Sequence, residues 1–372
     1  MHIFSPTEQE IIHKLTGAII HKIPTWFDQQ ARFIHQAPTA IRYQNSFAFL
    51  YTLTLADQSS ITLRVKIHRL EGNNSLASAI ADPNLKIVGR KEFNFLKIIA
   101  RGIQEQNDPQ LGFIRPIAYL PRWNAIIMIE LDAISFREIV FHPKMRLGDK
   151  HYRHRFEKAI YATGKWLRVY HQHLGKIEKK TFNADELGQK NAQRFKQIMQ
   201  MGISNPSIEA LRKKFIQVLK IINHRPATYA HQHGDFHFSN ILLSPDDKFI
   251  IIDMDPRYQE RLPIYADISA LLTDIKVQKM LLKSLGFLMS ESYLQKSQQL
   301  LLDGYFVDAP PDEIFLALYS ATGMLRAIHW YRERALEMSG AKKLLSTSAY
   351  PFMQRYFCRK AHTYLDHILK TT

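Results

Sequence analysis

Cysteine is almost absent from this sequence: Cys358 is the only one in 372 residues. A disulfide within the chain is therefore impossible, and disulfide-stapled folds and cysteine-rich zinc sites are excluded. Such a composition is typical of proteins in reducing compartments, so we expect a cytoplasmic protein.

Long apolar runs are also missing. The most apolar stretches, such as "AIIMIEL" and "FIIIDMD", are far too short to cross a bilayer. The first residues, "MHIFSPTEQEIIHK", are acidic and polar where a signal peptide has an apolar run. The composition, with 46% hydrophobic and 23% charged residues, is that of a globular protein, and the length predicts two lobes.

Acidic residues are scarce relative to basic ones, 34 against 50, which gives a formal net charge of +16. Such an excess indicates an anionic partner: a nucleic acid, a phosphorylated ligand or a membrane surface. The basic residues are densest in segments 137–158 and 211–225, although a solvated helix face would have the same composition. No zinc-finger spacing, aromatic RNA-binding motif or disordered basic arm accompanies these segments, so nucleic acid is the least favoured partner.

The spacing of apolar residues changes along the chain. Residues 6–37 have helical spacing with a break at Pro24, residues 39–68 alternate as three strands, residues 69–88 are typical of a polar loop, residues 89–104 are helical, and residues 112–131 return to strands. The remainder is helical apart from one hairpin, over residues 150–175, 184–202, 206–223, 264–286, 311–337 and 347–370. The sequence predicts an α+β fold: a small antiparallel sheet lobe with one key helix over residues 1–131, and a larger, mainly helical lobe over residues 132–372.

The segment "HQHGDFHFSNILL", residues 231–243, has two interpretations. Its histidines and aspartate resemble the H-x-H-x-D-H zinc motif of metallo-β-lactamase-like hydrolases. However, Phe236 shifts the second half of that motif out of register, and the later histidines, His329, His362 and His367, lie in segments with helical spacing. Zinc is therefore the less favoured interpretation.

The other interpretation is the catalytic loop of a phosphotransferase. Transfer of phosphate to a hydroxyl needs a carboxylate that orients the acceptor and takes its proton, together with oxygen ligands for Mg²⁺. Asp235 and Asn240 have the five-residue spacing of a kinase base and a metal-binding amide, and Asp253 leaves the hairpin "ILLSPDDKFIIIDMD" where a second metal ligand belongs. We therefore expect Asp235 to be the base, and Asn240 and Asp253 to bind the metal.

The predicted sheet lobe contains two matching candidates. Lys66 lies near the end of the third predicted strand, where a kinase lysine contacts the nucleotide phosphates. Glu92 lies in the following helix, where a glutamate fixes that lysine. Either residue alone would be an ordinary surface charge, but in this order with Asp235, Asn240 and Asp253 they indicate a kinase.

The hairpin and its flanking segments carry a further signature. "HGDFHFSNIL…IIDMD" is similar to the signature of the aminoglycoside phosphotransferase and choline kinase group, and "GKWLRVYHQHL" and "YADISALLTD" are similar to helices of that group. The resemblance implies a protein-kinase-like bilobal fold, and transfer of phosphate from ATP with Mg²⁺ to a hydroxyl of a small molecule. It also implies that Asp255 is a second acidic position near the metal, that His233 and His237 brace the loop, and that Asp267 is an N-cap-type or loop-bracing residue.

The turn before the second predicted strand departs from the kinase pattern. Its sequence, "QNSFAF", has no glycine, whereas a glycine-rich loop lets backbone N–H groups approach phosphates closely. The resemblance implies that Ser46 and the neighbouring amides contact the nucleotide instead. This departure, with the long segment between Lys66 and Glu92, leaves a second interpretation open: a pseudokinase-like scaffold that binds nucleotide without transferring phosphate.

The acceptor is the feature that the sequence defines least. The basic residues between 133 and 225 oppose a cationic acceptor and favour an anionic one, such as a sugar phosphate or an anionic glycolipid. The same charges could hold the protein peripherally at the inner face of an anionic membrane. Tyr258, Tyr265, Trp330 and Tyr331 leave a choline- or aminoglycoside-type acceptor open, because an aromatic cage binds such cations.

Overall fold

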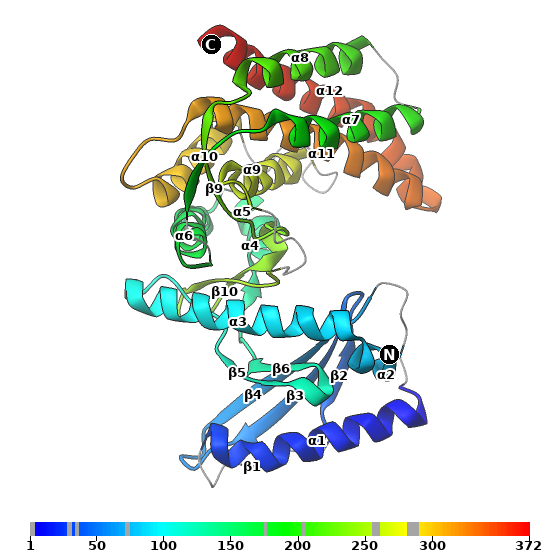
Figure 1. Cartoon of the computed structure of the whole chain (residues 1–372), viewed down its shortest axis with the longest axis vertical. Helices are drawn as coiled ribbons and strands as arrows, with labels where there is room; N and C mark the ends of the chain where they lie inside the picture. The colour runs from blue at the N-terminus through cyan, green and yellow to red at the C-terminus, as the bar shows by residue number, and fades with distance from the viewer. Residues whose placement is uncertain are drawn as a thin grey trace. The chain divides into compact units, whose positions relative to one another are not determined.

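The computed structural model describes residues 4–27, 32–33, 37–70, 75–146, 148–174, 177–202, 206–254, 261–280 and 290–372 (Figure 1). The chain forms two compact units. The first contains residues 1–134 and 242–258, and the second contains residues 135–241 and 259–372. The hairpin that precedes Asp253 therefore groups with the sheet, although the sequence places it within the predicted helical lobe.

The first unit is built on an antiparallel sheet. The strand order is β1–β3–β4–β6–β5, and β2 also pairs with β3. The alternation over residues 39–68 and 112–131 therefore predicted these strands correctly. The strands are β1 (Arg32–Phe33), β2 (Thr39–Arg42), β3 (Ser46–Thr54), β4 (Ser60–His68), β5 (Pro116–Leu120) and β6 (Ala125–Ile129), with a 3₁₀ turn (Pro121–Trp123) between the last two.

Two long helices flank this sheet. The first, α1 (Pro6–Trp26), begins with a capping box at Ser5, and its buried face packs with alternate residues of β3 and β4 in one apolar cluster. The second, α3 (Pro83–Gln106), contacts β4, β5 and β6, and Figure 1 shows it on the opposite side of the sheet from α1. Val65 and Ile67 belong to the cluster with α1, so Lys66 between them points to the side of α3.

The helix predicted over residues 6–37 is too long. It ends at Trp26, after Pro24, whose ring leaves the last turn without one backbone donor. Arg32 and Phe33 are not helical, because they pair with β3 as the edge strand β1. The rest of the predicted extension, residues 28–31 and 34–36, lies outside the described residues.

The loop predicted over residues 69–88 contains helical structure. It includes α2 (Leu76–Ala81) and the first turn of α3. The side chain of Ser75 accepts a hydrogen bond at the start of α2, and that of Asp82 accepts two at the start of α3. The cap at Asp82 starts α3 six residues before the predicted helical segment, residues 89–104, so Glu92 lies well inside the helix.

The hairpin of β10 (Ile241–Leu243) and β11 (Phe249–Ile251) is attached to the first unit by backbone hydrogen bonds. Phe249 N donates to the Gln110 carbonyl oxygen at 2.8 Å, and the Phe249 carbonyl oxygen accepts from Gly112 N at 2.8 Å. Because Asp253 follows β11 by two residues, these bonds bring it to the sheet that carries Lys66.

The second unit is mainly helical, and the helices predicted between residues 150 and 370 are present, except that residues 281–286 lie outside the described part. No helix is predicted from the sequence where α10 lies. The elements are β7 (Ile134–Ser135), α4 (Phe136–Phe141), α5 (Pro143–Arg146), α6 (Lys150–Leu174), β8 (Glu178–Thr181), α7 (Ala184–Gln200), α8 (Pro206–Ile222), β9 (Pro226–His231), a 3₁₀ turn η2 (Phe238–Asn240), β12 (Arg261–Pro263), α9 (Tyr265–Met280), α10 (Glu291–Tyr305), α11 (Glu313–Glu337) and α12 (Gly340–Thr371).

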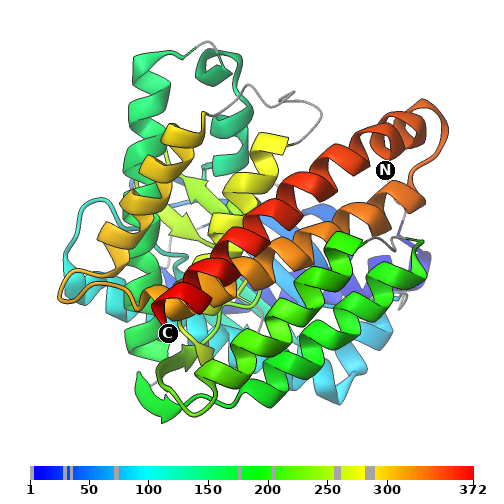
Figure 2. The ribbon, with the colours of Figure 1, turned by 90° about the horizontal axis from the view of Figure 1, so that it is seen from above.

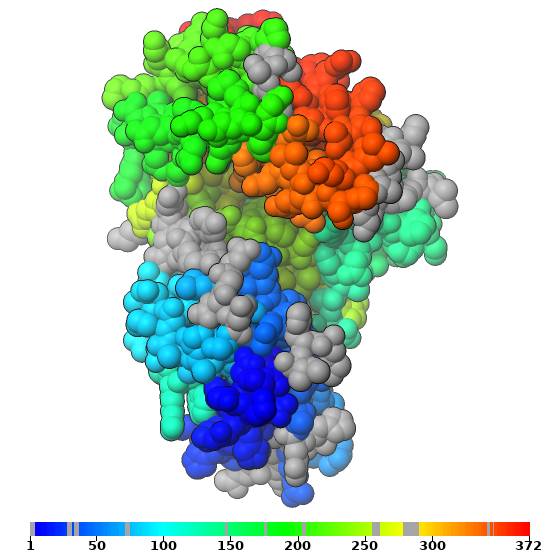
Figure 3. All heavy atoms as spheres, turned by 90° about the vertical axis from the view of Figure 1, so that its right-hand side faces the viewer, coloured from blue at the N-terminus to red at the C-terminus, as the bar shows by residue number. Residues whose placement is uncertain are grey.

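The central helix of the second unit is α11. Every residue from 314 to 325 is buried, as expected of a helix inside a bundle. It contacts α7, α9 and α12, and α12 in turn contacts α8. Figure 2 shows α7, α8, α11 and α12 side by side, and Figure 3 shows their side chains covering one face of this unit. In the described part of the chain, no helix combines the length and the apolar character that a membrane span requires.

Two glycines form the crossing of α6 and α10. A Cβ atom at Gly164 would lie 2.3 Å from the Leu301 carbonyl oxygen, and one at Gly304 would lie 2.2 Å from the Tyr161 carbonyl oxygen. Backbone atoms in helices cannot move aside as the end of a flexible side chain can. The crossing therefore accepts no side chain larger than hydrogen at either position.

We expect Gly164→Ala and Gly304→Ala each to lower the free energy of unfolding by about 2 to 3 kcal/mol, because the added methyl group overpacks the crossing. Gly17→Ala in α1 is the matched control. Nothing lies within 4 Å of the position of its Cβ, so this variant should gain up to about 1 kcal/mol from helix propensity. Urea unfolding measures all three, and wild-type stability of Gly164→Ala would contradict the close crossing.

Candidate active site

The first half of the candidate site is centred on Lys66 in the first unit. Its Nζ atom lies 2.9 Å from Glu92 Oε1 and 3.0 Å from Asp253 Oδ1. Lys66 and Glu92 are largely removed from solvent, with 16% and 4% of their side chains exposed, whereas 54% of the Asp253 side chain is exposed. The structure thus brings together three residues that the sequence places on a strand, a helix and the end of a distant hairpin.

The charges of this cluster support one another. Burial alone would lower the pKa of the Lys66 ammonium, but the carboxylates of Glu92 and Asp253 raise it well above its ordinary value. Burial alone would raise the pKa of Glu92, but Lys66 and His68 lower it to about 2. Lys66 and Glu92 are therefore both charged near neutral pH, and the Asp253 carboxylate beside them still faces solvent.

The backbone of Asp253 has an unusual conformation. Its φ of 56° lies in the left-handed region, which residues other than glycine seldom adopt. Residues in such regions concentrate at ligand sites, where the surroundings hold them in place. Here the ion pair with Lys66 is one of the contacts that hold the carboxylate.

The second half of the candidate site is the loop around Asp235 in the second unit. Asn240 Nδ2 donates to the Asp235 carbonyl oxygen at 2.9 Å and to Asp235 Oδ2 at 3.1 Å. Ser239 N donates to His237 Nδ1 at 3.2 Å, so a neutral His237 ring carries its proton on Nε2, 3.3 Å from Asp235 Oδ1. The hydrogen bond from His237 lowers the pKa of Asp235, so this half-exposed carboxylate is ionised at neutral pH.

Two aspartates on α9 hold this loop. Asp267 Oδ2 accepts a hydrogen bond from His233 N at 2.7 Å, and its Oδ1 accepts one from Gly234 N at 3.4 Å. Asp274, two turns further along α9, accepts one from Phe238 N at 2.8 Å. The bonds to Asp267 agree with the bracing role that the resemblance implied, whereas Asp274 was not identified from the sequence, although it ends the quoted segment "YADISALLTD".

Asp267 is fixed in turn by α6 and α10. His171 Nε2 lies 3.2 Å from Asp267 Oδ2, and His171 Nδ1 lies 2.7 Å from the Tyr305 hydroxyl. All three side chains are buried. His171 lies within the quoted segment "GKWLRVYHQHL", but nothing in the sequence indicates that Tyr305 is its partner.

The histidines near Asp235 do not gather as metal ligands. His233 is fully buried, and His237 caps the 3₁₀ turn η2. Across the described residues, no group of three or more His, Cys, Asp or Glu side chains is arranged to hold a metal ion. The zinc interpretation therefore receives no support from these contacts.

Asn240 and Asp253 each have the chemistry of a Mg²⁺ ligand. Asn240 uses its NH₂ group on Asp235, and within the described residues its amide oxygen accepts no hydrogen bond. The exposed Asp253 carboxylate supplies oxygen of the type that Mg²⁺ prefers. The two side chains belong to different compact units, and each fits the role separately.

Other predicted residues have more ordinary surroundings. Ser46 is the buried first residue of β3, opposite His68, and its carbonyl oxygen accepts from Tyr43 N at 2.8 Å. Its predicted contact with nucleotide stays a prediction. Asp255 and Tyr258 lie outside the described residues.

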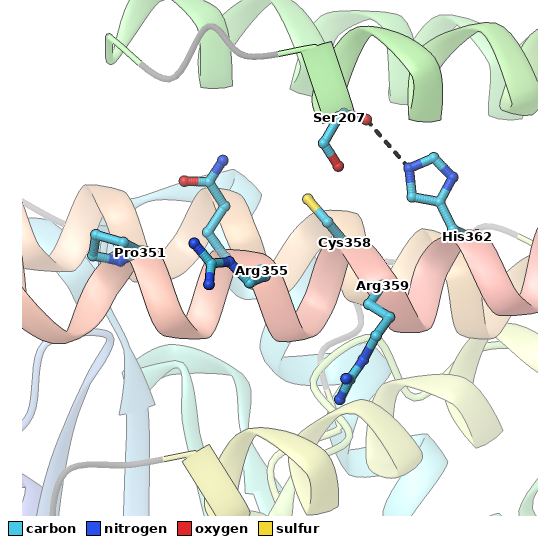
Figure 4. Close-up of a pocket in the computed structure, with 7 residues that line it drawn as sticks. Ser207, Pro351, Arg355, Cys358, Arg359 and His362 are labelled. Carbon is cyan, nitrogen blue, oxygen red and sulfur yellow. Dashed lines mark hydrogen bonds between the residues drawn. The ribbon is translucent and has the colours of Figure 1, made fainter.

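A groove between the start of α8 and one face of α12 lies outside this set. It has a volume of about 430 Å³ and is lined by residues that include Ser207, Arg355, Cys358 and His362 (Figure 4). Burial raises the pKa of the Cys358 thiol to about 11, so it stays protonated and is a poor nucleophile at neutral pH. None of the lining residues belongs to the loop around Asp235.

The comparisons with known proteins concern the fold. The chain matches no family model and no curated protein sequence. Among solved structures, a glucosamine kinase is similar over 96% of this chain and 81% of its own, with a TM-score of 0.54 and 13% identity. Macrolide 2'-phosphotransferase type I is similar over 95% of this chain and 99% of its own, with a TM-score of 0.51 and 12% identity.

The fold is protein-kinase-like. A second glucosamine kinase structure, in complex with glucosamine, ADP and inorganic phosphate, is similar over 92% of this chain and 82% of its own, with a TM-score of 0.53 and 13% identity. These likenesses confirm the fold class predicted from the sequence and its resemblance to small-molecule phosphotransferases. At this identity they establish architecture, so the chemistry must be argued from the residues themselves.

We expect Glu92→Gln to lower the free energy of unfolding at neutral pH by about 3 kcal/mol, because it removes one partner of a buried ion pair. Glu105→Gln, at an exposed position of the same helix, is the control and should change it by less than about 1 kcal/mol.

The effect of Glu92→Gln on the free energy of unfolding should depend on pH. The pKa of Glu92 in the folded state, about 2, lies below its ordinary value of 4.5, so its stabilising contribution is present above pH 4.5 and is lost as the pH falls toward 2. Urea unfolding of wild type and Glu92→Gln across this range should show the difference shrinking in acid. A difference independent of pH would contradict the ion pair.

Asp267→Asn should lower the free energy of unfolding by about 2 kcal/mol, because charge-assisted hydrogen bonds to the loop are lost. Hydrogen exchange at the His233 and Gly234 amides should rise more than elsewhere, since their acceptor is weakened. Asp303→Asn on the exposed surface of α10 is the control. Unchanged protection of the two amides would argue against bracing by Asp267.

Proposed function

We propose that this chain is an ATP- and Mg²⁺-dependent phosphotransferase that phosphorylates a hydroxyl of a small-molecule or glycolipid acceptor carrying negative charge. The observation that carries the proposal is Lys66 held between Glu92 and Asp253. A lysine fixed by a helix glutamate beside a metal-site aspartate is the arrangement that kinases use for nucleotide phosphates. The similarity in fold to a glucosamine kinase in complex with ADP supports the use of a nucleotide.

Asp235 would act on the acceptor. It is ionised at neutral pH, and its hydrogen bonds with His237 and Asn240 hold the carboxylate in one orientation. A carboxylate in this state can orient a hydroxyl group and take its proton as the phosphoryl group moves.

On the nucleotide side, Lys66 would bind phosphate oxygens with a charge that its buried carboxylate partners keep in place. Asn240 and Asp253 would hold Mg²⁺, which when bound neutralises charge on the phosphates.

The glycine-free turn before β3 is the feature that favours a pseudokinase-like scaffold. Against that alternative, Asp235, Asn240, Asp253, Lys66 and Glu92 are all present, and a scaffold that only binds nucleotide has no need for an ordered base. Turnover therefore decides between the two.

The aromatic residues give little support to a choline- or aminoglycoside-type acceptor. Tyr265 and Tyr331 are buried, and their hydroxyls bond to Asp312 N and the Val277 carbonyl oxygen. Trp330 is partly exposed, with Arg334 over its ring. A guanidinium at this ring face competes with a ligand cation, so these three residues do not form a ready cation cage.

We expect Asp235→Asn to lower acceptor-dependent ADP release by about a thousandfold, because the group that takes the proton is lost. Asp246→Asn is the matched control: Asp246 is an exposed carboxylate in the turn of the hairpin, paired with Lys248. The assay uses ATP and Mg²⁺ with sugar phosphates, anionic glycolipids in vesicles, uncharged sugars, choline and aminoglycosides.

The assay has distinct outcomes. Turnover with one acceptor class that vanishes in Asp235→Asn supports the proposal and names the class. Nucleotide binding without turnover for any acceptor would favour the scaffold. Equal turnover by Asp235→Asn and wild type would overturn the role of Asp235.

A further inference from the structure

Two helices of the second unit, α7 and α11, run side by side in a constant register. Asn191 Nδ2 donates to Thr322 Oγ1 at 3.5 Å, and ten residues further along each helix the Arg332 guanidinium donates to the Met201 carbonyl oxygen at 3.1 and 3.2 Å. Both contacts join residues 131 positions apart in the sequence. The two helices are therefore parallel over this stretch, and Figure 2 shows them next to each other.

Each of these helices carries an arginine within the same stretch. Arg194 is one turn beyond Asn191 on α7, and Arg326 is one turn beyond Thr322 on α11. The constant register brings the two arginines to the same level of the bundle. Arg194 is partly exposed and Arg326 is exposed, although Leu325, Ala327 and Ile328 beside it are buried.

Within the part of the chain that the structure describes, no ion pair neutralises the positive charge of this arginine pair. Arg194 Nη1 donates to the neutral Asn191 Oδ1 at 3.0 Å, and among the described residues neither arginine forms an ion pair with a carboxylate. Basic residues nearby in sequence differ in this respect, since Lys190 pairs with Glu186 at 2.8 Å and Arg212 with Glu209 at 2.7 Å. Partial removal from water and the charge of Arg326 lower the pKa of Arg194 to about 10.

The arginine pair lies beside the catalytic loop. A Cβ atom at Gly323 would lie 2.0 Å from Thr273 Oγ1, so α11 touches α9 at this point. One turn further along α11 is Arg326, and next to Thr273 is Asp274, which holds Phe238 of the loop.

The carboxylates around the loop do not satisfy this arginine. The protein atoms that surround Arg326 lower the pKa of this solvent-accessible side chain, although Asp267, Asp235 and Asp274 are near enough to oppose the decrease. Asp267 and Asp274 already accept hydrogen bonds from the backbone of the loop, and Asp235 from Asn240. An additional anion would supply hydrogen-bond acceptors to two guanidinium groups whose one hydrogen bond within the described residues runs from Arg194 to Asn191.

We propose that Arg194 and Arg326 bind an anionic group of the acceptor, a phosphate or a carboxylate, while its hydroxyl lies at Asp235. Two guanidinium groups from different helices match the oxygen atoms of such a group, because each can donate two parallel hydrogen bonds. That the bound anion belongs to an acceptor depends on the phosphotransferase activity proposed above, whereas the anion site itself depends only on the arginine pair. The substrate class is then a polyol or sugar that already carries one phosphate or carboxylate.

A binding experiment tests the anion site without turnover. Glycerol 3-phosphate is titrated into the full chain by calorimetry, with and without ADP and Mg²⁺, and glycerol serves as the uncharged probe. We expect Arg194→Gln/Arg326→Gln to weaken glycerol 3-phosphate binding at least about tenfold, in line with the loss of charged hydrogen bonds. Arg194→Lys/Arg326→Lys keeps both charges but loses the paired hydrogen bonds, so its affinity should lie between that of the wild type and that of the double glutamine variant, which guards against a loss caused by misfolding.

Arg334→Gln is the matched control, because it removes an exposed arginine from the same helix two turns further on. The affinity of this variant for glycerol 3-phosphate should stay within about twofold of that of the wild type, as expected for loss of a surface charge. Equal binding by the wild type and the double glutamine variant would overturn the proposal, as would no preference of the wild type for glycerol 3-phosphate over glycerol.

A kinetic experiment separates recognition of the acceptor from support of the loop. ADP release is measured with pairs of acceptors that differ by one phosphate, such as glucosamine and glucosamine 6-phosphate. We expect the double glutamine variant to raise KM for the phosphorylated member at least about tenfold, with kcat and KM for ATP little changed. An equal fall in kcat for both members would show that the arginines only balance the carboxylates around the loop, and the proposal would fail.

The two proposals can fail separately. If no acceptor is turned over although glycerol 3-phosphate binds and the double glutamine variant abolishes that binding, the phosphotransferase proposal fails while the anion site stands. If turnover occurs but uncharged acceptors are preferred and the double variant changes nothing, the anion site fails while the phosphotransferase stands.

Discussion

The buried ammonium group of Lys66 is the interaction on which the nucleotide side of the candidate site depends. A cation removed from water is stable only with carboxylates in contact, and its two partners are Glu92 on α3 and Asp253, two residues after the hairpin. One charge therefore fixes a strand, a helix and a distant segment relative to one another. The backbone hydrogen bonds of Phe249 to residues 110 and 112 hold the hairpin to the unit that contains the sheet.

In the second half of the candidate site, around Asp235, the helix α9 has the corresponding role. Asp267 and Asp274 are seven residues apart, so both lie on one face of that helix and hold the loop at two points. Because Gly323 allows α11 to contact α9 directly, the helix that positions the loop is anchored to the centre of the bundle. The orientation of Asp235 thus derives from helix packing in the interior rather than from the loop itself.

Local pattern was enough to predict much of this. Alternation identified the strands around Lys66, and the spacing of Asp235 and Asn240 with the hairpin before Asp253 selected the residues of the candidate site. Pairing between distant segments was not predictable, which is why residues 32–33 were expected to be helical although they form the edge strand β1. The same reason conceals Arg194 and Arg326, since only the register of α7 and α11 brings them together.

The net charge of the chain says less about its partners than its size suggests, because many of the basic residues form ion pairs. In the basic segment 211–225, Arg212, Lys214 and Arg225 pair with Glu209, Asp366 and Asp312. These pairs reduce the charge that the segment offers to a membrane or a nucleic acid. Arg194 and Arg326 differ from these residues because neither forms an ion pair with any described carboxylate, so arrangement is more informative here than composition.

The crossing of α6 and α10 has a consequence for the chemistry as well as for packing. Tyr305 follows Gly304, and its hydroxyl reaches His171, which in turn contacts Asp267. The separation of two helix backbones therefore sets the length of a chain of hydrogen bonds that ends at the loop of Asp235. A residue buried in α10 can in this way influence the orientation of Asp235, the proposed base, without touching it. A small change in the spacing of the two helices at Gly164 and Gly304 would be passed on to that orientation.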